Sequence, residues 1–189
     1  MSPRRAPKRD RLTYRPTTVA DLELLVDHRH RMWSDIGHRS ERAIRAHDPL
    51  YRKWALARLR SGELTGFVAV APDGKPVASG LVWYRPDQPR PRLPSLVSPY
   101  ILSMYTDPAW RGKGVATRIV KELLKEIRRA GYPDADLHAS RFGRHVYARF
   151  GFERTWEMRL WIDPRYAPRR VPARPPKRKK SKGLDRARR

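Results

Sequence analysis

The sequence predicts a mixed α/β domain whose sheet is partly antiparallel and partly parallel. Two strand patterns, Thr65–Ala71 and Pro76–Tyr84, flank a Pro-Asp-Gly-Lys turn, which is typical of a β-hairpin. An amphipathic helix pattern at Val115–Ala130 separates two further strand patterns, Tyr100–Thr106 and Ala135–Ala139. This strand–helix–strand order favours a parallel pair beside the antiparallel hairpin.

Two helices are predicted between a first strand, Leu12–Arg15, and the hairpin. The first opens with a capping box at Thr18–Asp21 and ends at Gly37. Its apolar stripe comprises Leu22, Leu25, Val26, the stem of Arg29, Met32, Trp33 and Ile36. The second helix is predicted over Pro49–Arg60, with proline in its first turn and Gly62 after its end.

The C-terminal half continues the alternation of strands and helices. A Pro-rich loop, Arg85–Pro99, precedes the strand at Tyr100–Thr106. The helix that follows ends at Gly131, and Pro133 prevents its continuation. A short helix is predicted over Arg141–Phe150, and the alternating residues Glu153–Ile162 predict a final strand.

Composition excludes several classes of chemistry. The chain has 189 residues and no Cys, so disulfides and Cys-ligated metals are excluded. His28 and His30 lie two residues apart on a helix and point to different sides, and no third ligand accompanies His138 and His145, so we predict no metal site. No run of about 18 apolar residues suggests a membrane span, and no apolar run follows the basic N-terminus, so we expect a cytoplasmic protein.

The net charge of +24 is concentrated at the two ends of the chain. Residues 1–11 are predicted to form a basic disordered arm, and residues 164–189 a basic Pro-rich disordered tail with twelve Lys/Arg and one Asp. The domain itself is expected at residues 12–163. The run Lys177–Lys182 could bind nucleic acid or ribosomes through phosphate charge alone, or could be a solvated tail.

Two glycines at the entrance of the long helix predict an anion site. A helix N-terminus presents unpaired N–H groups, and Gly112 and Gly114 leave the approach to them open. Arg111 and Lys113 add positive charge, and Ala116 is small. The alternative is a basic turn whose glycines only relieve backbone strain. Neither the Walker pattern nor the dinucleotide fingerprint matches.

The pattern Arg-x-x-Gly-x-Ala at Arg111–Ala116 resembles the signature of the GNAT superfamily of N-acetyltransferases, which holds the pyrophosphate of acetyl-CoA. The segment Tyr14–Trp33 is similar to that superfamily's first strand and helix, and Leu137–Phe152 to its closing strand–helix unit. The resemblance covers about Leu12 to Ile162. It implies a GNAT-like α/β fold: a mixed, partly antiparallel sheet with a splayed central strand pair, flanked by helices.

The resemblance also implies the cofactor residues for acetyl-CoA, the acetyl donor. The backbone of Met104, Tyr105 and Thr106 would bind the pantetheine arm. Ser140 stands where many relatives have an arm-contacting Asn, and offers a shorter hydroxyl. The pyrophosphate would be held around Arg111, Gly112, Lys113, Gly114, Val115, Ala116 and Thr117.

The implied activity is N-acetyl transfer from acetyl-CoA to a primary amine by direct attack. Tyr147 is the predicted general acid toward the CoA thiolate; the alternative is a core Tyr packed with Phe150 and Phe152. The backbone N–H of Tyr105 is the predicted oxyanion contact. The rival function is a non-catalytic CoA-binding module that associates with nucleic acid or ribosomes through the basic tail.

The general base and the acceptor are left open by the sequence. The strand Tyr100–Thr106 carries no carboxylate, so a water at Ser103 or Tyr105, or the carboxylates Asp35 and Glu41, are alternatives. The acceptor is expected to be a small-molecule or peptide primary amine, and the basic surface favours an acidic or neutral one. Trp33, Trp54 and the Pro-rich loop are candidate pocket walls, although core packing is the commoner role of a Trp. The protein is expected to be a monomer or homodimer.

Overall fold

One five-stranded sheet organises the chain in the computed structural model, which describes residues 12–37, 40–89 and 95–163. Its strands follow in spatial order β1-β2-β3-β4-β5. The first three neighbouring pairs are antiparallel and the β4–β5 pair is parallel, so the predicted mixed sheet is confirmed. The strands are β1 (Thr13–Pro16), β2 (Leu64–Val70), β3 (Pro76–Pro86), β4 (Val97–Thr106) and β5 (Asp136–Leu137).

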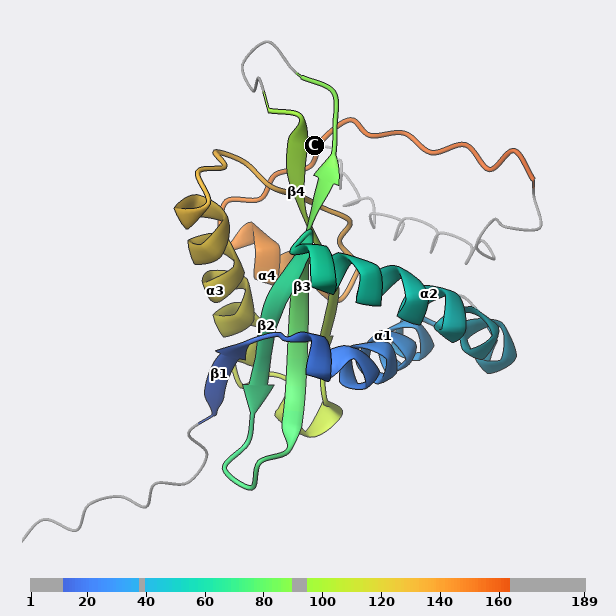
Figure 1. Cartoon of the computed structure of the whole chain (residues 1–189), viewed down its shortest axis with the longest axis vertical. Coiled ribbons are helices and arrows are strands. Elements are labelled where there is room, and N and C mark those ends of the chain that lie inside the picture. The colour runs from blue at the N-terminus through green and yellow to red at the C-terminus, as the bar shows by residue number, and fades with distance from the viewer. Residues whose placement is uncertain (1–11, 38–39, 90–94, 164–189) are drawn as a thin grey trace, which may run out of the picture. The chain divides into compact units, whose positions relative to one another are not determined.

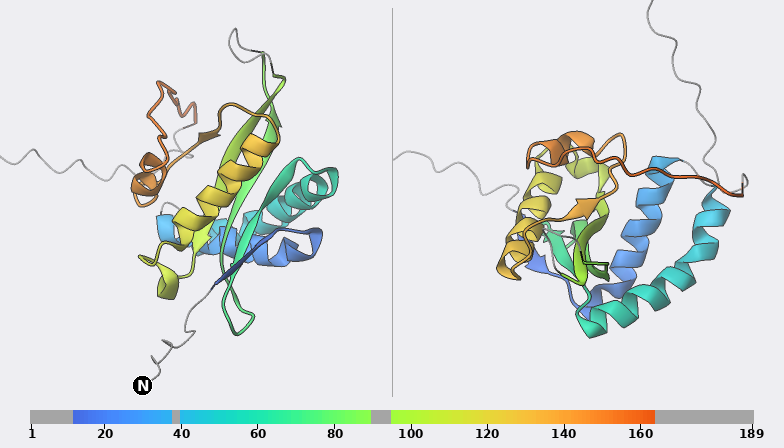
Figure 2. Two further views of the ribbon diagram at one scale, coloured as in Figure 1. Left: turned by 90° about the vertical axis from the view of Figure 1, so that its left-hand side faces the viewer. Right: turned by 90° about the horizontal axis from the view of Figure 1, so that it is seen from above.

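Helices cover both faces of this sheet (Figure 1). Figure 2 shows α3 on one face and the pair α1 and α2 on the other. The helices are α1 (Leu22–Ile36), α2 (Glu41–Ser61), α3 (Val115–Arg129) and α4 (Arg144–Ala148), with single 3-10 turns at η1 (Val19–Asp21) and η2 (Pro108–Trp110).

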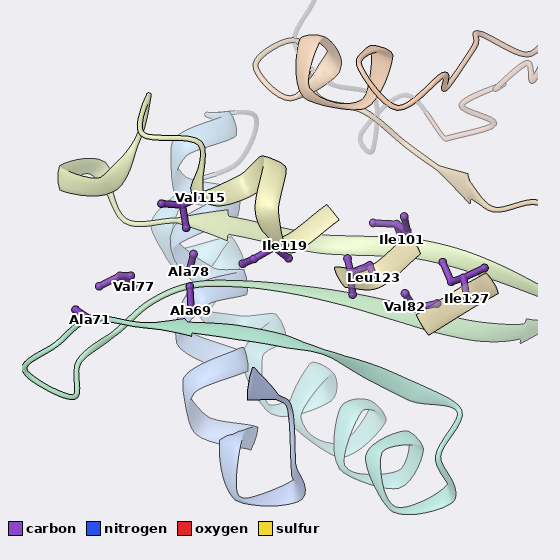
Figure 3. Close-up of a cluster of buried hydrophobic side chains, with 10 residues drawn as sticks. All are labelled: Ala69, Ala71, Val77, Ala78, Val82, Ile101, Val115, Ile119, Leu123 and Ile127. Atoms are coloured by element: carbon purple, nitrogen blue, oxygen red, sulfur yellow. The ribbon is translucent and has the colours of Figure 1, made fainter. Parts of the chain in front are cut away.

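The amphipathic pattern of α3 is confirmed by its packing. Ile119, Leu123 and Ile127 are buried against small and branched residues of β2, β3 and β4 (Figure 3). Truncating a fully buried leucine such as Leu123 to Ala costs about 2–5 kcal/mol of stability, because the transfer term and the cavity term add. This cluster therefore anchors α3, and with it the start of the helix at Val115.

A second cluster packs α1 and α2 against the opposite face. Leu25 of α1, Tyr51 and Ala55 of α2, and Leu64 and Leu81 of the sheet are its buried members. The predicted ends of both helices are confirmed, since Gly37 and Gly62 adopt the left-handed conformation at the two C-caps. This packing places α1 beside β4, where the candidate site lies.

The predicted start of α2 is wrong. The helix begins at Glu41 and Pro49 lies inside it. Ser40 caps the true start by accepting from the Ala43 N–H at 3.3 Å. His30 of α1 then bridges Glu41 and Asp48 at 2.5 and 2.7 Å. These tertiary contacts hold a polar half-helix that its own sequence pattern does not predict.

The hairpin is confirmed, but the Pro-rich loop is shorter than predicted. Gly74 has φ 85° in the Pro-Asp-Gly-Lys turn. Strand β3 runs on to Pro86 and β4 begins at Val97, with Asp87 N–H donating to Leu96 C=O at 2.9 Å. Pro99, assigned to the loop, is a buried strand residue. Residues 90–94 of this loop lie outside the described residues.

The predicted final strand, Glu153–Ile162, is wrong. None of these residues is in a strand, and Trp156 and Met158 are 98% and 94% exposed. Alternation predicts a strand only if a partner strand is available, and no pairing is made here among the described residues. Residues 159–163 belong to a separate compact unit, in which Arg159 lies over the Trp161 ring. The predicted arm and tail lie outside the described parts of the chain.

Candidate active site

The sheet opens where β4 and β5 part. These strands pair only at Tyr100 with Asp136 and Ile101 with Leu137. Beyond Ile101 this edge of β4 has no strand partner within the described ranges. The backbone N–H and C=O groups of an unpaired edge are ready to bind an extended ligand. Met104, Tyr105 and Thr106, the predicted arm-binding residues, lie on this free edge.

A bulge in β4 distorts the same edge. Ser79 of β3 pairs with Tyr105 and Leu81 pairs with Leu102, so Ser103 and Met104 together oppose Gly80. Ser103 has φ 51°, the only positive φ of a non-glycine residue in the described parts of the chain. Such strain is kept where the surrounding structure over-determines it, and it is common at functional sites.

Gly80 makes room for the bulge. A Cβ on Gly80 would lie 2.7 Å from Ile119 Cγ2 and closer still to the sulfur of Met104. The Met104 side chain therefore points toward α3, and only its backbone is free to serve a ligand on the β4 edge. Sequence analysis missed both Ser103 as a strained residue and Gly80 as its counterpart.

The entrance of α3 is built from left-handed glycines. Gly112 and Gly114 have φ 73° and 78°, a region that favours glycine. Gly114 is the N-cap of α3, and no side chain caps the helix. The first-turn N–H groups of α3, Val115 to Thr117, therefore keep their free hydrogen-bonding capacity. A Cβ on either glycine would meet nothing within 4 Å, so the backbone conformation, and not internal packing, requires the glycines.

The two cations of this loop are held by the protein. Arg111 donates through Nε to Thr106 C=O at 2.9 Å and through Nη2 to Asp35 Oδ2 at 2.5 Å. It therefore ties the loop to the end of β4 and to α1. Lys113 lies 4.9 Å from the Trp110 ring centroid. The charge of both residues remains beside the α3 entrance, although the side chain of Arg111 is already engaged.

Ser140 and Tyr147 meet around α4. The Ser140 hydroxyl accepts from the Gly143 N–H at 3.2 Å, which leaves its own proton free to donate. The ring of Tyr147 lies over Gly143, because a Cβ there would be 3.1 Å from Tyr147 Cε2 and 3.6 Å from Ser140 Oγ. Burial raises the pKa of Tyr147 to about 12, so its hydroxyl keeps its proton. Its ring also meets the edge of Phe152 at 5.9 Å, as the core-packing alternative expects.

On its other side, β4 faces polar and aromatic side chains of α1 and α2. Burial raises the pKa of Tyr51, although a weak hydrogen bond with its neighbour Ser103 and the charge of Arg29 act to lower it. The buried Tyr51 hydroxyl has no partner at good hydrogen-bond geometry. Arg29 lies 4.4 Å above the Tyr51 ring. Trp54 stacks on Tyr51 at 5.7 Å and joins the second core cluster, as core packing predicts.

The predicted carboxylate bases are both engaged. Asp35 pairs with Arg111, and Glu41 accepts from His30 and, at 3.0 Å, from Ser34. Between α1 and α2 lies an open cleft of about 300 Å³ lined by Glu23, Val26, Asp27, His30, Arg45, Asp48 and Arg52. Its charges are mostly paired within the protein, for example Arg52 with Glu23 at 2.6 Å.

His28 of α1 is buried against the sheet. Its Nδ1 is 2.9 Å from Ser79 Oγ, and its ring centroid is 4.7 Å from that of Tyr105. Burial lowers the pKa of His28 to about 4, so the imidazole is neutral near pH 7. His30 points instead to Asp48 and Glu41, as the two-residue spacing predicts.

The described residues contain no group of three His, Cys, Asp or Glu residues that could hold a metal ion. They also contain no helix that is both long and apolar enough to cross a membrane.

Comparison with known proteins identifies the family. The model of the acetyltransferase (GNAT) family matches residues 22–152. A GCN5-related N-acetyltransferase from Ralstonia eutropha is 32% identical, with 80% of this chain and 99% of that chain covered and a TM-score of 0.75. The chain therefore belongs to the acetyltransferase (GNAT) family, and the predicted resemblance and fold are confirmed.

Another solved structure is a predicted acetyltransferase with acetyl-CoA from Clostridium acetobutylicum. It is 27% identical, with 82% of this chain and 97% of that chain covered and a TM-score of 0.74. An aminoglycoside N-acetyltransferase in complex with CoA is 20% identical, with 82% and 97% covered and a TM-score of 0.60, and it shows the fold alone. A comparison with curated protein sequences gives no match.

Proposed function

We propose that the protein is an N-acetyltransferase that moves an acetyl group from acetyl-CoA to a primary amine by direct attack. Tyr147 is the general acid toward the CoA thiolate in this proposal. One observation carries it. The connection that follows β4 leads directly to the start of α3, so the unpaired, bulged edge of β4 is followed by a helix N-terminus that has glycines and no side-chain cap. A diphosphate and an extended amide-bearing arm need these two features side by side.

The residues of the α3 entrance suit a pyrophosphate. The N–H groups from Gly112 to Thr117 offer donors at the positive end of the helix dipole. Lys113 supplies charge beside them from its place over Trp110. Arg111 would act by holding the loop to Asp35 and Thr106, because its guanidinium is already engaged there.

The residues of the sheet opening suit the pantetheine arm. Met104, Tyr105 and Thr106 offer backbone groups on the free edge of β4, and the Ser140 hydroxyl has a proton to donate. The Tyr105 N–H is our proposed donor to the acetyl carbonyl oxygen. The positive φ of Ser103 changes the direction of the β4 backbone next to these groups.

Bound acetyl-CoA supplies a thioester, whose sulfur leaves as the amine takes the acetyl group. Tyr147 Oη holds a proton at neutral pH because the pKa of its hydroxyl is about 12. Against a solvated thiol of pKa about 8.5, complete proton transfer would be uphill by about 5 kcal/mol. Tyr147 therefore helps chiefly as a hydrogen-bond donor to the sulfur. Desolvation raises the pKa of the thiol and so reduces the pKa difference between it and Tyr147.

The amine must lose a proton, and no described carboxylate is free on β4 to take it. An amine of pKa about 10.4 is neutral in roughly one molecule in 10³ to 10⁴ at pH 7, a deficit of about 4–5 kcal/mol. We propose that water held near Ser103 or Tyr105 relays this proton, because Asp35 and Glu41 are engaged elsewhere.

The test is thiol release from acetyl-CoA with a panel of amines that includes polyamines, amino acids, aminoglycosides and N-terminal peptides. We expect Tyr147→Phe to lower kcat tenfold or more and to leave acetyl-CoA affinity unchanged. The control is Tyr132→Phe, since the Tyr132 ring packs on Tyr84 at the far end of α3. Unchanged turnover in Tyr147→Phe would remove this residue from the mechanism. Stabilisation by CoA without turnover on any amine would favour the non-catalytic CoA-binding module.

A further inference from the structure

Arg29, in the wall between α1 and α2, is a cation without an ion-pair partner among the described residues. Its Cζ lies 4.4 Å from the Tyr51 ring centroid and 5.9 Å from that of Trp33. Burial lowers the pKa of this guanidinium, although the charge remains at neutral pH. Arg29 makes no ion pair and no side-chain hydrogen bond with another described residue, unlike Arg31 and Arg52.

The surroundings of Arg29 make this unusual. Its neighbours pair readily: Arg31 with Asp27 at 3.0 Å and Arg52 with Glu23 at 2.6 Å. The charge of Asp48 raises the pKa of Arg29 without forming an ion pair with it; Asp48 Oδ2 binds His30 at 2.7 Å, and the buried Oδ1 has no hydrogen-bond partner among the described residues. A half-buried charge without a partner is costly, and its aromatic neighbours offset only part of that cost.

A second unsatisfied donor lies beside it. The Tyr51 hydroxyl is fully buried, and its neighbour Ser103 lies beside it but outside good hydrogen-bond geometry. Buried polar groups are nearly always satisfied in native proteins, so an orphan hydroxyl needs an explanation such as a ligand. Arg29 and Tyr51 together present donors, and their missing partner is therefore an acceptor. An anion with two oxygens would satisfy both groups.

The position of the pair relates it to the reaction. The Tyr51 ring lies under Arg29, and its hydroxyl lies next to Ser103 at the bulge of β4. One tyrosine side chain therefore spans the distance between the cation and the edge where we place the acetyl group. A molecule whose amine lies at the bulge would bring an acidic group to Arg29. The planar fork of arginine matches the two oxygens of a carboxylate.

We propose that Arg29 and Tyr51 receive a carboxylate of the acceptor, so that the substrate class is an amine that also bears a carboxylate, as in a free amino acid. This inference rests on the proposed acetyltransferase function. The net charge of +24 favours the approach of such a molecule over that of a polyamine.

The test compares matched acceptors, each an amino acid and the amine left by its decarboxylation, such as phenylalanine with phenethylamine and lysine with cadaverine. We expect kcat/KM to favour the carboxylate member by about 10- to 150-fold, the range for hydrogen bonds to a charged group. Arg29→Met should abolish this preference while its unbranched stem keeps the packing over Tyr51. Arg29→Lys should restore part of it, and the surface variant Arg52→Gln should keep it in full.

A binding arm separates this inference from the proposed function. Calorimetry with CoA-loaded protein measures the affinity for each member of a pair whether or not turnover occurs. Tighter binding of the carboxylate member that is lost in Arg29→Met supports the site even if no acetyl transfer is seen. Transfer or binding without a carboxylate preference, or a preference retained in Arg29→Met, would overturn it. Stronger binding of phosphoethanolamine or taurine than of the amino acids would refute the assignment of a carboxylate.

Discussion

Gly114→Ala separates the two explanations for the glycines at the α3 entrance. Gly114 has φ 78°, and an added Cβ would meet nothing within 4 Å of the protein. Any L-residue there pays roughly 1–2 kcal/mol for the left-handed conformation. If the first-turn N–H groups bind a diphosphate, the methyl group also obstructs the ligand. Losing one charge-assisted hydrogen bond, about 1.5–3 kcal/mol, would weaken CoA binding about 10- to 150-fold.

Gly62→Ala is the matched control. Gly62 has φ 77°, also has nothing within 4 Å of an added Cβ, and ends α2 beside the opposite end of the sheet. Both variants should melt at lower temperature, by about 2–4 °C for each kcal/mol lost. Calorimetry with CoA should show weaker binding for Gly114→Ala alone. Equal stability losses with unchanged CoA affinity in both variants would show that the glycines serve only the backbone turn.

Three further predictions concern Gly143, Tyr147 and His28. Gly143→Ala should fold as well as the wild type, since φ −87° and ψ −18° suit alanine. It should lower kcat about tenfold, because the new Cβ would lie 3.1 Å from the Tyr147 ring and displace it. An unchanged kcat would contradict the placement of that ring. The pH profile of kcat should show no ionisation of Tyr147 below about pH 11, because its pKa is about 12, and a basic limb that disappears in Tyr147→Phe would count against this. Burial lowers the pKa of His28 in the folded protein to about 4, against an ordinary 6.5. Urea unfolding should therefore show up to about 3 kcal/mol of stability lost as pH falls from 6.5 to 4. His28→Gln should make stability less dependent on pH in this range, and an equally steep loss in the variant would rule out His28 as its cause.

Local sequence was sufficient where an element carries its own signals. Helix α3 has both a buried stripe and a glycine at each end, and the hairpin has its turn residues, so both were predicted nearly to the residue. The first half of α2 was missed because its stability comes from His30 on another helix. The strand predicted at Glu153–Ile162 is wrong because an alternating pattern does not show whether a partner strand is available.

The site residues also fall into those that local sequence predicts and those that depend on tertiary packing. The Gly motif and Tyr147 were recognisable because their spacing is local and resembles a known family. Arg29 and Tyr51 belong to different helices, and their relation depends on how α1 and α2 pack. A signal did exist: Arg29 interrupts an otherwise apolar stripe on α1, which indicates a cation held at the edge of a core. The strain at Ser103 has no counterpart in sequence, because no proline or glycine marks the bulge.

The most direct test of the central claim is amide NMR during titration with CoA. We predict that the backbone N–H signals of Gly112, Gly114, Val115 and Ala116 shift strongly as the diphosphate binds, while that of Gly62 does not move. If CoA binds and these four signals stay in place, the pyrophosphate is held elsewhere and the proposed site is wrong.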